Sequence, residues 1–165
     1  MINKEKKFDP FVYQNLFYEY NLNITHDEIN QVMHLVKNLK SSEQNTTFEC
    51  LNILNFPLLK NLKKQIIDIL DNHKLFLRFN WAQLYNKNDQ HSIHTHYGSY
   101  YSGIIYLKGH NPSPTYFYDR LFEPFAYDFK ENQLLMFPSM IPHEVRKLNE
   151  DEQRLIISFN TERKN

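Results

Sequence analysis

The stretch "HSIHTHYGSYYSGIIYLKG", residues 91–109, carries three histidines in its first six positions and then becomes an apolar, aromatic run. Residues two apart on a β-strand point to the same face, so a strand here would place His94 and His96 side by side with Thr95 turned away. His91, at odd spacing from His94, would point to the opposite face. Two imidazoles on one strand can share a metal ion, but solvated histidines at a strand edge give the same pattern.

The surrounding sequence, from Leu75 onward, is typical of short β-strands. Segments rich in Phe, Tyr, Ile and Val alternate with Asn, Asp, Gly and Pro, which break strands. The predicted strands are 75–85, 92–96, 100–107, 115–119, 125–129, 133–137, 143–148 and 154–160. Strands of this number and length predict a small jelly roll built from two sheets.

The N-terminal part predicts helices. Thr25 and Glu28 form a capping box that opens a helix from His26 to Leu39, and a second helical pattern covers 57–74 with Pro57 in its first turn. A length of 165 residues favours one domain. We therefore predict a single α+β, mainly β domain over 1–165, in which about 1–74 is helical support on one sheet and about 75–165 is the jelly-roll core.

Composition narrows the classes of partner. The chain has 19 basic and 19 acidic residues, which favours neither nucleic acid nor a membrane surface as partner. No segment approaches the roughly 18 uninterrupted apolar residues of a membrane-spanning helix. Cys50 is the only cysteine, which excludes an intramolecular disulfide and suits a reducing compartment. These features predict a cytoplasmic protein that binds no nucleic acid and no membrane.

A third candidate ligand lies in "FPSMIPHEV", residues 137–145, where His143 opens a predicted strand. The antiparallel strands of a jelly roll can bring it beside His94 and His96, as a metal with open coordination positions requires. A histidine hydrogen-bonded within its own loop is an equal alternative.

Arg154 begins the strand "RLIISFN", in which it shares one face with Ile156 and Ser158. If that face is internal, the guanidinium needs a partner, and its fork fits a carboxylate through two parallel hydrogen bonds. This favours an acidic ligand, with Ser158 as an additional donor. An Arg154 that reaches solvent from the strand start remains the alternative.

Two tyrosines are further candidates. Tyr106 shares a strand face with Ser102, and Tyr85 shares one with Trp81. Either hydroxyl can donate to a carboxylate in the pocket, although packing alone also accounts for tyrosines in strands.

Together these residues resemble the Fe(II)- and 2-oxoglutarate-dependent oxygenases, nearest the prolyl-hydroxylase-like branch and a short bacterial and phage family. "HTHYGSYYSGIIYL" is similar to that family's H-x-H segment leading into S-G-x-x-Y-L, and "FPSMIPHEV" to its F-P-S-x-x-x-H-x-V. "YDRL" and "QRLIISFN" are similar as well. The resemblance covers roughly Asn80 to Asn160 and rests on the order Tyr85, His94, His96, Ser102, Tyr106, Leu107, His143 and Arg154.

The resemblance implies a double-stranded β-helix in which His94 and His143 bind Fe(II). It implies that Arg154 and Tyr106 hold the distal carboxylate of 2-oxoglutarate and that Tyr85 lies near its metal end. Ser102 and Ser158 are weaker pocket candidates.

The implied reaction hydroxylates an unactivated C–H bond and converts 2-oxoglutarate and O2 to succinate and CO2, with ascorbate as a candidate reductant. A peptidyl proline is the first candidate substrate. The candidate residues for a substrate mouth are Tyr97, Tyr100, Tyr101, Tyr116 and Tyr118.

The sequence departs from the larger superfamily at position 96, where Asp or Glu usually completes a two-histidine, one-carboxylate triad. We predict that His96 is the third ligand, with Asp119 as the substitute. Three neutral imidazoles would leave Fe(II) with its full charge instead of partly neutralising it. Two alternatives stay open: a three-histidine thiol dioxygenase-like enzyme and a non-enzymatic jelly-roll binding module.

Overall fold

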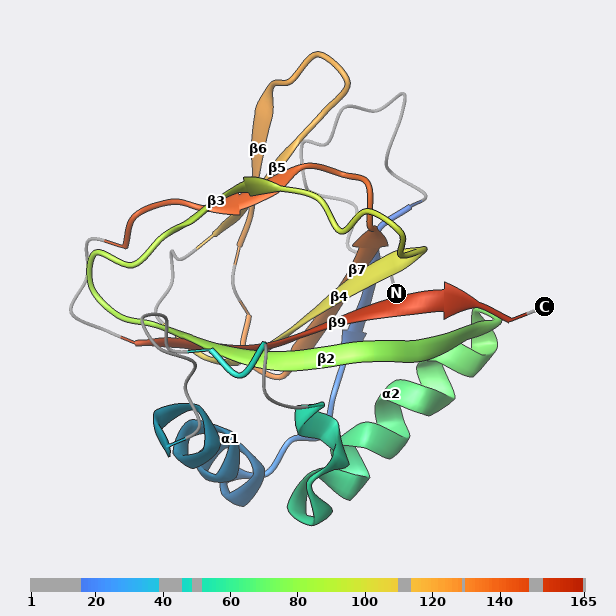
Figure 1. The fold of residues 1–165 in the computed structure, drawn as a ribbon, viewed down its shortest axis with the longest axis vertical. Coiled ribbons are helices and arrows are strands. Elements are labelled where there is room, and N and C mark those ends of the chain that lie inside the picture. The colour runs from blue at the N-terminus through green and yellow to red at the C-terminus, as the bar shows by residue number, and fades with distance from the viewer. Residues whose placement is uncertain are drawn as a thin grey trace.

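Two antiparallel β-sheets face each other, and helices cover the outer face of the larger one (Figure 1). The computed structural model describes residues 16–38, 46–48, 52–109, 114–128, 130–148 and 153–164. The large sheet has the order β1 (Tyr18–Asn21), β7 (Gln133–Pro138), β4 (Tyr101–Lys108), β9 (Arg154–Arg163) and β2 (Leu75–Tyr85). The small sheet has the order β3 (His91–His94), β8 (His143–Val145), β5 (Thr115–Tyr118) and β6 (Pro124–Tyr127). The predicted mainly β jelly roll is confirmed.

The capping box places the start of the first helix correctly, whereas the second helix is shorter than the predicted range 57–74. In α1 (His26–Asn38), Thr25 N donates to Glu28 Oε2 at 2.8 Å and Glu28 N donates to Thr25 Oγ1 at 3.2 Å, which is the predicted capping box. Pro57 opens a 3-10 turn, Pro57–Leu59, which leads into α2 (Lys60–Asn72), and a further 3-10 turn, Ile53–Asn55, precedes it. Leu39 and Cys50 lie outside the described residues.

The large sheet separates two cores because its side chains alternate. On β4, Ile105 and Leu107 pack with the helices, whereas Ile104 and Tyr106 point between the sheets. The side chains of β9 alternate in the same way, with Ile157 toward the helices and Ile156 between the sheets. The candidate site lies in the space between the sheets, where polar side chains occur among apolar ones.

Several boundaries differ from the sequence prediction; β9, for example, runs past the predicted end at residue 160 to Arg163. Residues Tyr18–Asn21, in the part predicted to be helical, form β1 and pair with β7 at the sheet edge. The strand predicted over 92–96 ends at His94, because His96 N donates to Ser139 O in the β7–β8 loop. The strand predicted over 143–148 ends at Val145, because Leu148 N instead donates to Asp89 O. Within the described residues, neither α1 nor α2 nor any other helix has the length and apolarity to cross a bilayer.

Replacing Gly103 by alanine is expected to destabilise the fold. Gly103 lies opposite Phe159 in the sheet, and a Cβ there would lie 2.1 Å from Phe159 Cζ, far closer than two non-bonded carbon atoms approach. Overpacking of this kind costs about 1–3 kcal/mol, to be measured by urea unfolding. Adding Phe159→Leu makes room for the new methyl group. The double variant should therefore lose less free energy of unfolding than the two single variants lose in sum. Strictly additive losses would contradict this explanation.

Candidate metal centre

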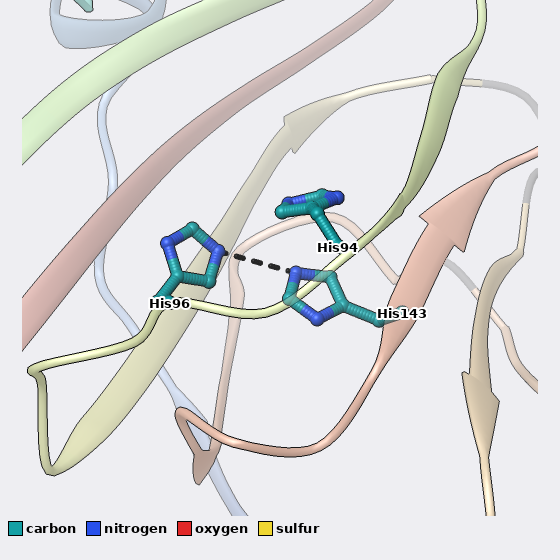
Figure 2. Close-up of side chains that lie close together, drawn as sticks. All are labelled: His94, His96 and His143. Atoms are coloured by element: carbon teal, nitrogen blue, oxygen red, sulfur yellow. Dashed lines mark hydrogen bonds between the residues drawn. The ribbon is translucent and has the colours of Figure 1, made fainter.

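Three histidines from two segments of the small sheet converge between the sheets. His94, at the end of β3, and His143, at the start of β8, lie directly opposite each other in the antiparallel pair. His96 follows in the loop. One ring nitrogen from each residue lies within 4.8 Å of the others, and Figure 2 shows the three rings gathered together. The predicted set is therefore brought together as a group that can hold a metal ion.

Backbone carbonyls fix which nitrogens face the centre. His94 Nδ1 lies 2.8 Å from Ser92 O, and His143 Nδ1 lies 3.0 Å from Ile141 O. Because a carbonyl only accepts, both Nδ1 atoms carry the proton and both Nε2 atoms present a lone pair. The Nε2 atoms of His96 and His143 are 3.3 Å apart. An outer hydrogen bond on the second ring nitrogen is the usual support of a metal-binding histidine.

The environment keeps these imidazoles neutral. Burial, followed by repulsion from His94 and His91, lowers the pKa of His96 to about 4. Burial also lowers the pKa of His94, and holds that of His143 well below its usual value. Neutral imidazole is the form that binds a metal. In an octahedral geometry, three such ligands leave three positions for other molecules.

The group contains no carboxylate among the described residues. Asp119, the substitute predicted from sequence, closes the β5–β6 turn instead: its Oδ1 accepts from Leu121 N at 2.8 Å and from Glu123 N at 2.9 Å. The donor set of three neutral nitrogens fits a divalent transition metal such as Fe(II), whose charge it would leave unneutralised.

The predicted orientation of His91, away from His94, is wrong. Its ring stacks on that of His94, with centroids 4.1 Å apart and planes at 14°. The register shifts between His91 and His94, and such an irregularity breaks the alternation on which the prediction relied. His91 therefore lines the same pocket, and its Nδ1 lies 3.4 Å from Tyr85 Oη.

Arg154 forms the second polar centre of the pocket, and of the two orientations that the sequence left open, internal and solvent-facing, the structure has the internal one. Arg154 is 1% exposed, and its Nη2 donates to Thr115 Oγ1 at 2.7 Å. Its guanidinium carbon lies 5.6 Å from the ring centroid of Tyr85 and 5.5 Å from that of Tyr106. Tyr106 Oη and Thr115 Oγ1 are 3.2 Å apart. Thr115 escaped the sequence analysis, because nothing in "TYFYD" distinguishes it from a packing residue.

The two tyrosines are neutral hydroxyl donors at ordinary pH. Burial raises the pKa of Tyr85 to about 12 and also raises that of Tyr106, and in both cases the charge of Arg154 opposes the shift. A neutral hydroxyl beside a guanidinium can donate to a carboxylate.

One pocket joins the two centres. Its lining includes Trp81, Tyr85, His91, His94, His96, Ser102, Thr115, His143, Arg154 and Ser158. Tyr106 packs in the core between the sheets, beside Arg154.

None of the five tyrosines predicted for a substrate mouth lines this pocket. Tyr101 packs on the helix side of the sheet, so its predicted place is wrong. Tyr116 stacks against Arg146, and Tyr118 Oη donates to Glu144 Oε1 at 2.7 Å. Only Tyr97 and Tyr100 are half or more exposed, at 88% and 50%.

The metal-free protein is expected to lose stability as the pH falls from about 6.5 to about 4. The pKa of His91 and of His96 is lowered from 6.5 to about 4. Over this range the unfolded chain binds protons that the folded chain does not, so the free energy of unfolding falls with pH and levels off below the folded pKa.

This slope can be measured by urea unfolding at a series of pH values with a chelator present. The double variant His91→Gln/His96→Gln should flatten the slope. His34→Gln, on the exposed side of α1, is the matched control. A slope that the double variant leaves unchanged would assign the effect to other groups.

Several solved structures have a fold similar to that of this chain. An oxidoreductase of the 2OG-Fe(II) oxygenase family from Burkholderia pseudomallei is similar, with a TM-score of 0.63, 13% identity, and coverage of 90% of this chain and 85% of that one. The 2OG complex of the viral collagen prolyl hydroxylase from Paramecium bursaria Chlorella virus-1 has a TM-score of 0.65, 9% identity, and coverage of 91% and 97%. HygX from Streptomyces hygroscopicus, with nickel and 2-oxoglutarate bound, has a TM-score of 0.65, 11% identity, and coverage of 89% and 82%.

No protein-family model and no curated sequence matches the chain. At these identities the similarity establishes the fold. This chain has the jelly-roll fold of 2-oxoglutarate oxygenases, prolyl hydroxylases among them.

Proposed function

We propose that this protein is an Fe(II)- and 2-oxoglutarate-dependent dioxygenase that hydroxylates an unactivated C–H bond. The observation that carries the proposal is one pocket between the sheets, with three converging neutral histidines and the buried guanidinium of Arg154. A metal ligand set and a carboxylate partner are the two things that a bound 2-oxo acid requires. The shared fold of known 2-oxoglutarate oxygenases supports the same conclusion.

His94, His96 and His143 would hold Fe(II) through their Nε2 atoms. The iron, when bound with 2-oxoglutarate and O2, supplies the oxidising chemistry that yields succinate, CO2 and a hydroxylated product. The chain's own part is to occupy one side of the metal and leave the other side open. Ser92 O and Ile141 O hold two of the rings in orientation.

Arg154 would pair with the distal carboxylate of 2-oxoglutarate. Thr115 already receives one N–H of the guanidinium and so fixes its plane, and Tyr106 lies beside Thr115 as a second donor. Tyr85 lies between Arg154 and His91, which suits a role toward the metal end of the cosubstrate. Ser158 lines the same pocket and remains a candidate donor.

A peptidyl proline is our proposed substrate. Support comes from the prolyl hydroxylase among the structural neighbours and from the exposed aromatic side chains of Tyr97 and Tyr100, close in sequence to His96. Proline-containing peptides incubated with enzyme, Fe(II), 2-oxoglutarate and ascorbate should gain one oxygen atom by mass spectrometry. Hydroxylation confined to other residues or to small molecules would contradict this choice.

The three-histidine set also favours a second candidate, a thiol dioxygenase-like enzyme that oxidises a sulfur substrate without a cosubstrate acid. In that case Arg154 would hold the carboxylate of the substrate itself. The two functions differ in whether 2-oxoglutarate binds the metal.

Anaerobic addition of Fe(II) and then 2-oxoglutarate separates them. The proposed function predicts a visible metal-to-ligand charge-transfer band that needs both additions and weakens in His96→Ala and in Arg154→Ala. His34→Ala is the matched control, since His34 lies on the exposed side of α1. Iron binding without this band would favour the thiol dioxygenase, and a chain that binds no iron would favour the binding module.

A further inference from the structure

Gln83 lies in the wall of the pocket that faces the histidines across the space between the sheets (Figure 1). It lies on β2 between Trp81 and Tyr85, and residues two apart on a strand share a face. The ring centroids of Trp81 and His96 are 5.6 Å apart, and Tyr85 Oη lies 3.4 Å from His91 Nδ1. The residues on both sides of Gln83 therefore reach the histidine group, and the side chain of Gln83 faces the region between these two contacts.

The backbone of Gln83 is held on both sides, whereas its amide is free. Gln83 pairs with Ile156 of β9, and Thr46 forms a β-bridge with it on the other side. Its side chain is half-buried and forms no hydrogen bond within the part of the chain that the structure describes. The same holds for the hydroxyl of Ser158, which follows Ile156 on the same face of β9 and lines the same pocket. Two polar groups on one wall are thus available to a ligand.

The charge of the pocket favours an anionic ligand. Among the described residues its lining contains no Asp and no Glu, and its permanent charge is the guanidinium of Arg154. Arg154 lies at the end of β2 that carries Tyr85, which is where the distal carboxylate of the cosubstrate would be bound. The other end of such a diacid then lies at the histidines, in front of Gln83. A carboxylate enclosed there needs hydrogen-bond donors for the lone pairs that a metal does not use.

We propose that Gln83 donates its side-chain amide to the carboxylate by which the cosubstrate binds the metal. In the proposed function, on which this inference rests, that group is the C1 carboxylate of 2-oxoglutarate. Ser158 is the second donor on the same wall. An amide suits this position because it supplies two N–H donors without adding a charge of its own. Hydrogen bonds to an ionised acceptor are also stronger than bonds between neutral groups.

The test uses two acids that share one end. Pyruvate has the 2-oxo acid end of 2-oxoglutarate and no distal carboxylate. Isothermal titration of the Co(II)-loaded full chain gives the affinity for each. Gln83→Leu should lower the affinity for both acids about 10–100-fold, the range expected for a hydrogen bond to a charged group. Arg154→Met should weaken 2-oxoglutarate alone. A Gln83→Leu protein that binds either acid as the wild type does would overturn the inference.

Gln83→Glu separates this role from a purely structural one. The side chain keeps its size, but a carboxylate replaces the amide. It should repel the acid and lower 2-oxoglutarate affinity below that of Gln83→Leu. The same negative charge facing the metal should raise Co(II) affinity, because three neutral imidazoles leave the charge of the ion unneutralised. Unchanged Co(II) affinity in Gln83→Glu would place the side chain away from the metal and overturn the inference.

Gln31→Leu is the matched control. Gln31 is a half-buried glutamine on α1, outside the pocket. Its replacement should leave the affinities for Co(II) and for both acids unchanged. A loss of acid affinity in Gln31→Leu equal to that in Gln83→Leu would show a general effect of removing a glutamine and would overturn the inference.

Failure of the inference is distinguishable from failure of the proposed function. A normal charge-transfer band with Fe(II) and 2-oxoglutarate, together with unchanged acid affinities in Gln83→Leu, would keep the dioxygenase and remove the role of Gln83. Pyruvate binding that Gln83→Leu weakens, with no such band in the wild type, would do the reverse. A wild-type chain that binds neither acid overturns both.

Discussion

Replacing His143 by glutamine should abolish metal binding at the pocket and leave the fold intact. His143 is 5% exposed, and its Nε2 is held toward the centre by the bond from Nδ1 to Ile141 O. Glutamine has a similar size and can keep a donor toward that carbonyl, but its amide is a poor ligand for Fe(II). We expect Fe(II) and Co(II) affinity to fall by more than about 100-fold, beyond the effect of losing an outer-shell partner.

Isothermal titration of the purified variant with Co(II) measures this loss, and urea unfolding checks that the fold persists. His34→Gln, on the exposed side of α1, controls for nonspecific binding by surface histidines. A His143→Gln protein that binds Co(II) as the wild type does would show that His143 is not a ligand, and the three-histidine site would be wrong.

Replacing Arg154 by methionine should remove 2-oxoglutarate binding without removing the metal. Methionine fills much of the same volume, and exchanging a buried charge for an apolar side chain is often neutral for stability. The contact that this variant would lose is the buried, charge-assisted pair between the guanidinium and the distal carboxylate of 2-oxoglutarate. Removing one partner of such a pair costs about 2–5 kcal/mol in binding free energy. We therefore expect 2-oxoglutarate affinity to fall about 100-fold while Co(II) affinity stays within about twofold of the wild type.

Arg154→Lys is the informative companion. Lysine keeps the positive charge but not the planar fork that Thr115 orients, so its affinity for 2-oxoglutarate should lie between those of the wild type and Arg154→Met. Titration of 2-oxoglutarate into the Co(II)-loaded protein gives all three values. Equal affinity in wild type and Arg154→Met would show that the carboxylate partner lies elsewhere.

Local patterns predicted much of the fold because they depend on neighbours in the chain. The alternation in "SGIIYL" and "RLIISFN" correctly grouped Tyr106 with Ile104 and Arg154 with Ile156, on faces that the structure turns between the sheets. The capping box at Thr25 correctly placed the start of α1. β1 escaped prediction, since four residues at a sheet edge are strand only because β7 pairs with them.

The sequence predicted which residues form the candidate site and their order along the chain. It was wrong about how His91 and His96 are placed, for physical reasons. The odd spacing of His91 and His94 failed because the register shifts between them. His96 joins His94 from a loop and not from a shared strand face, held there by Ser139 O. Asn160 shares its strand face with Arg154 by the same alternation, but only the tertiary structure brings it within 3.3 Å of His96.

The sequence by itself determined most of the strand segments and which side chains share a strand face, because side-chain alternation and helix capping act over a few residues. The tertiary structure alone decided which of these residues meet. The pairing of β3 with β8 sets His94 opposite His143, and the packing of the small sheet on the large one sets Thr115 of β5 against Arg154 of β9. Such contacts depend on strand register between distant segments, which no local pattern specifies.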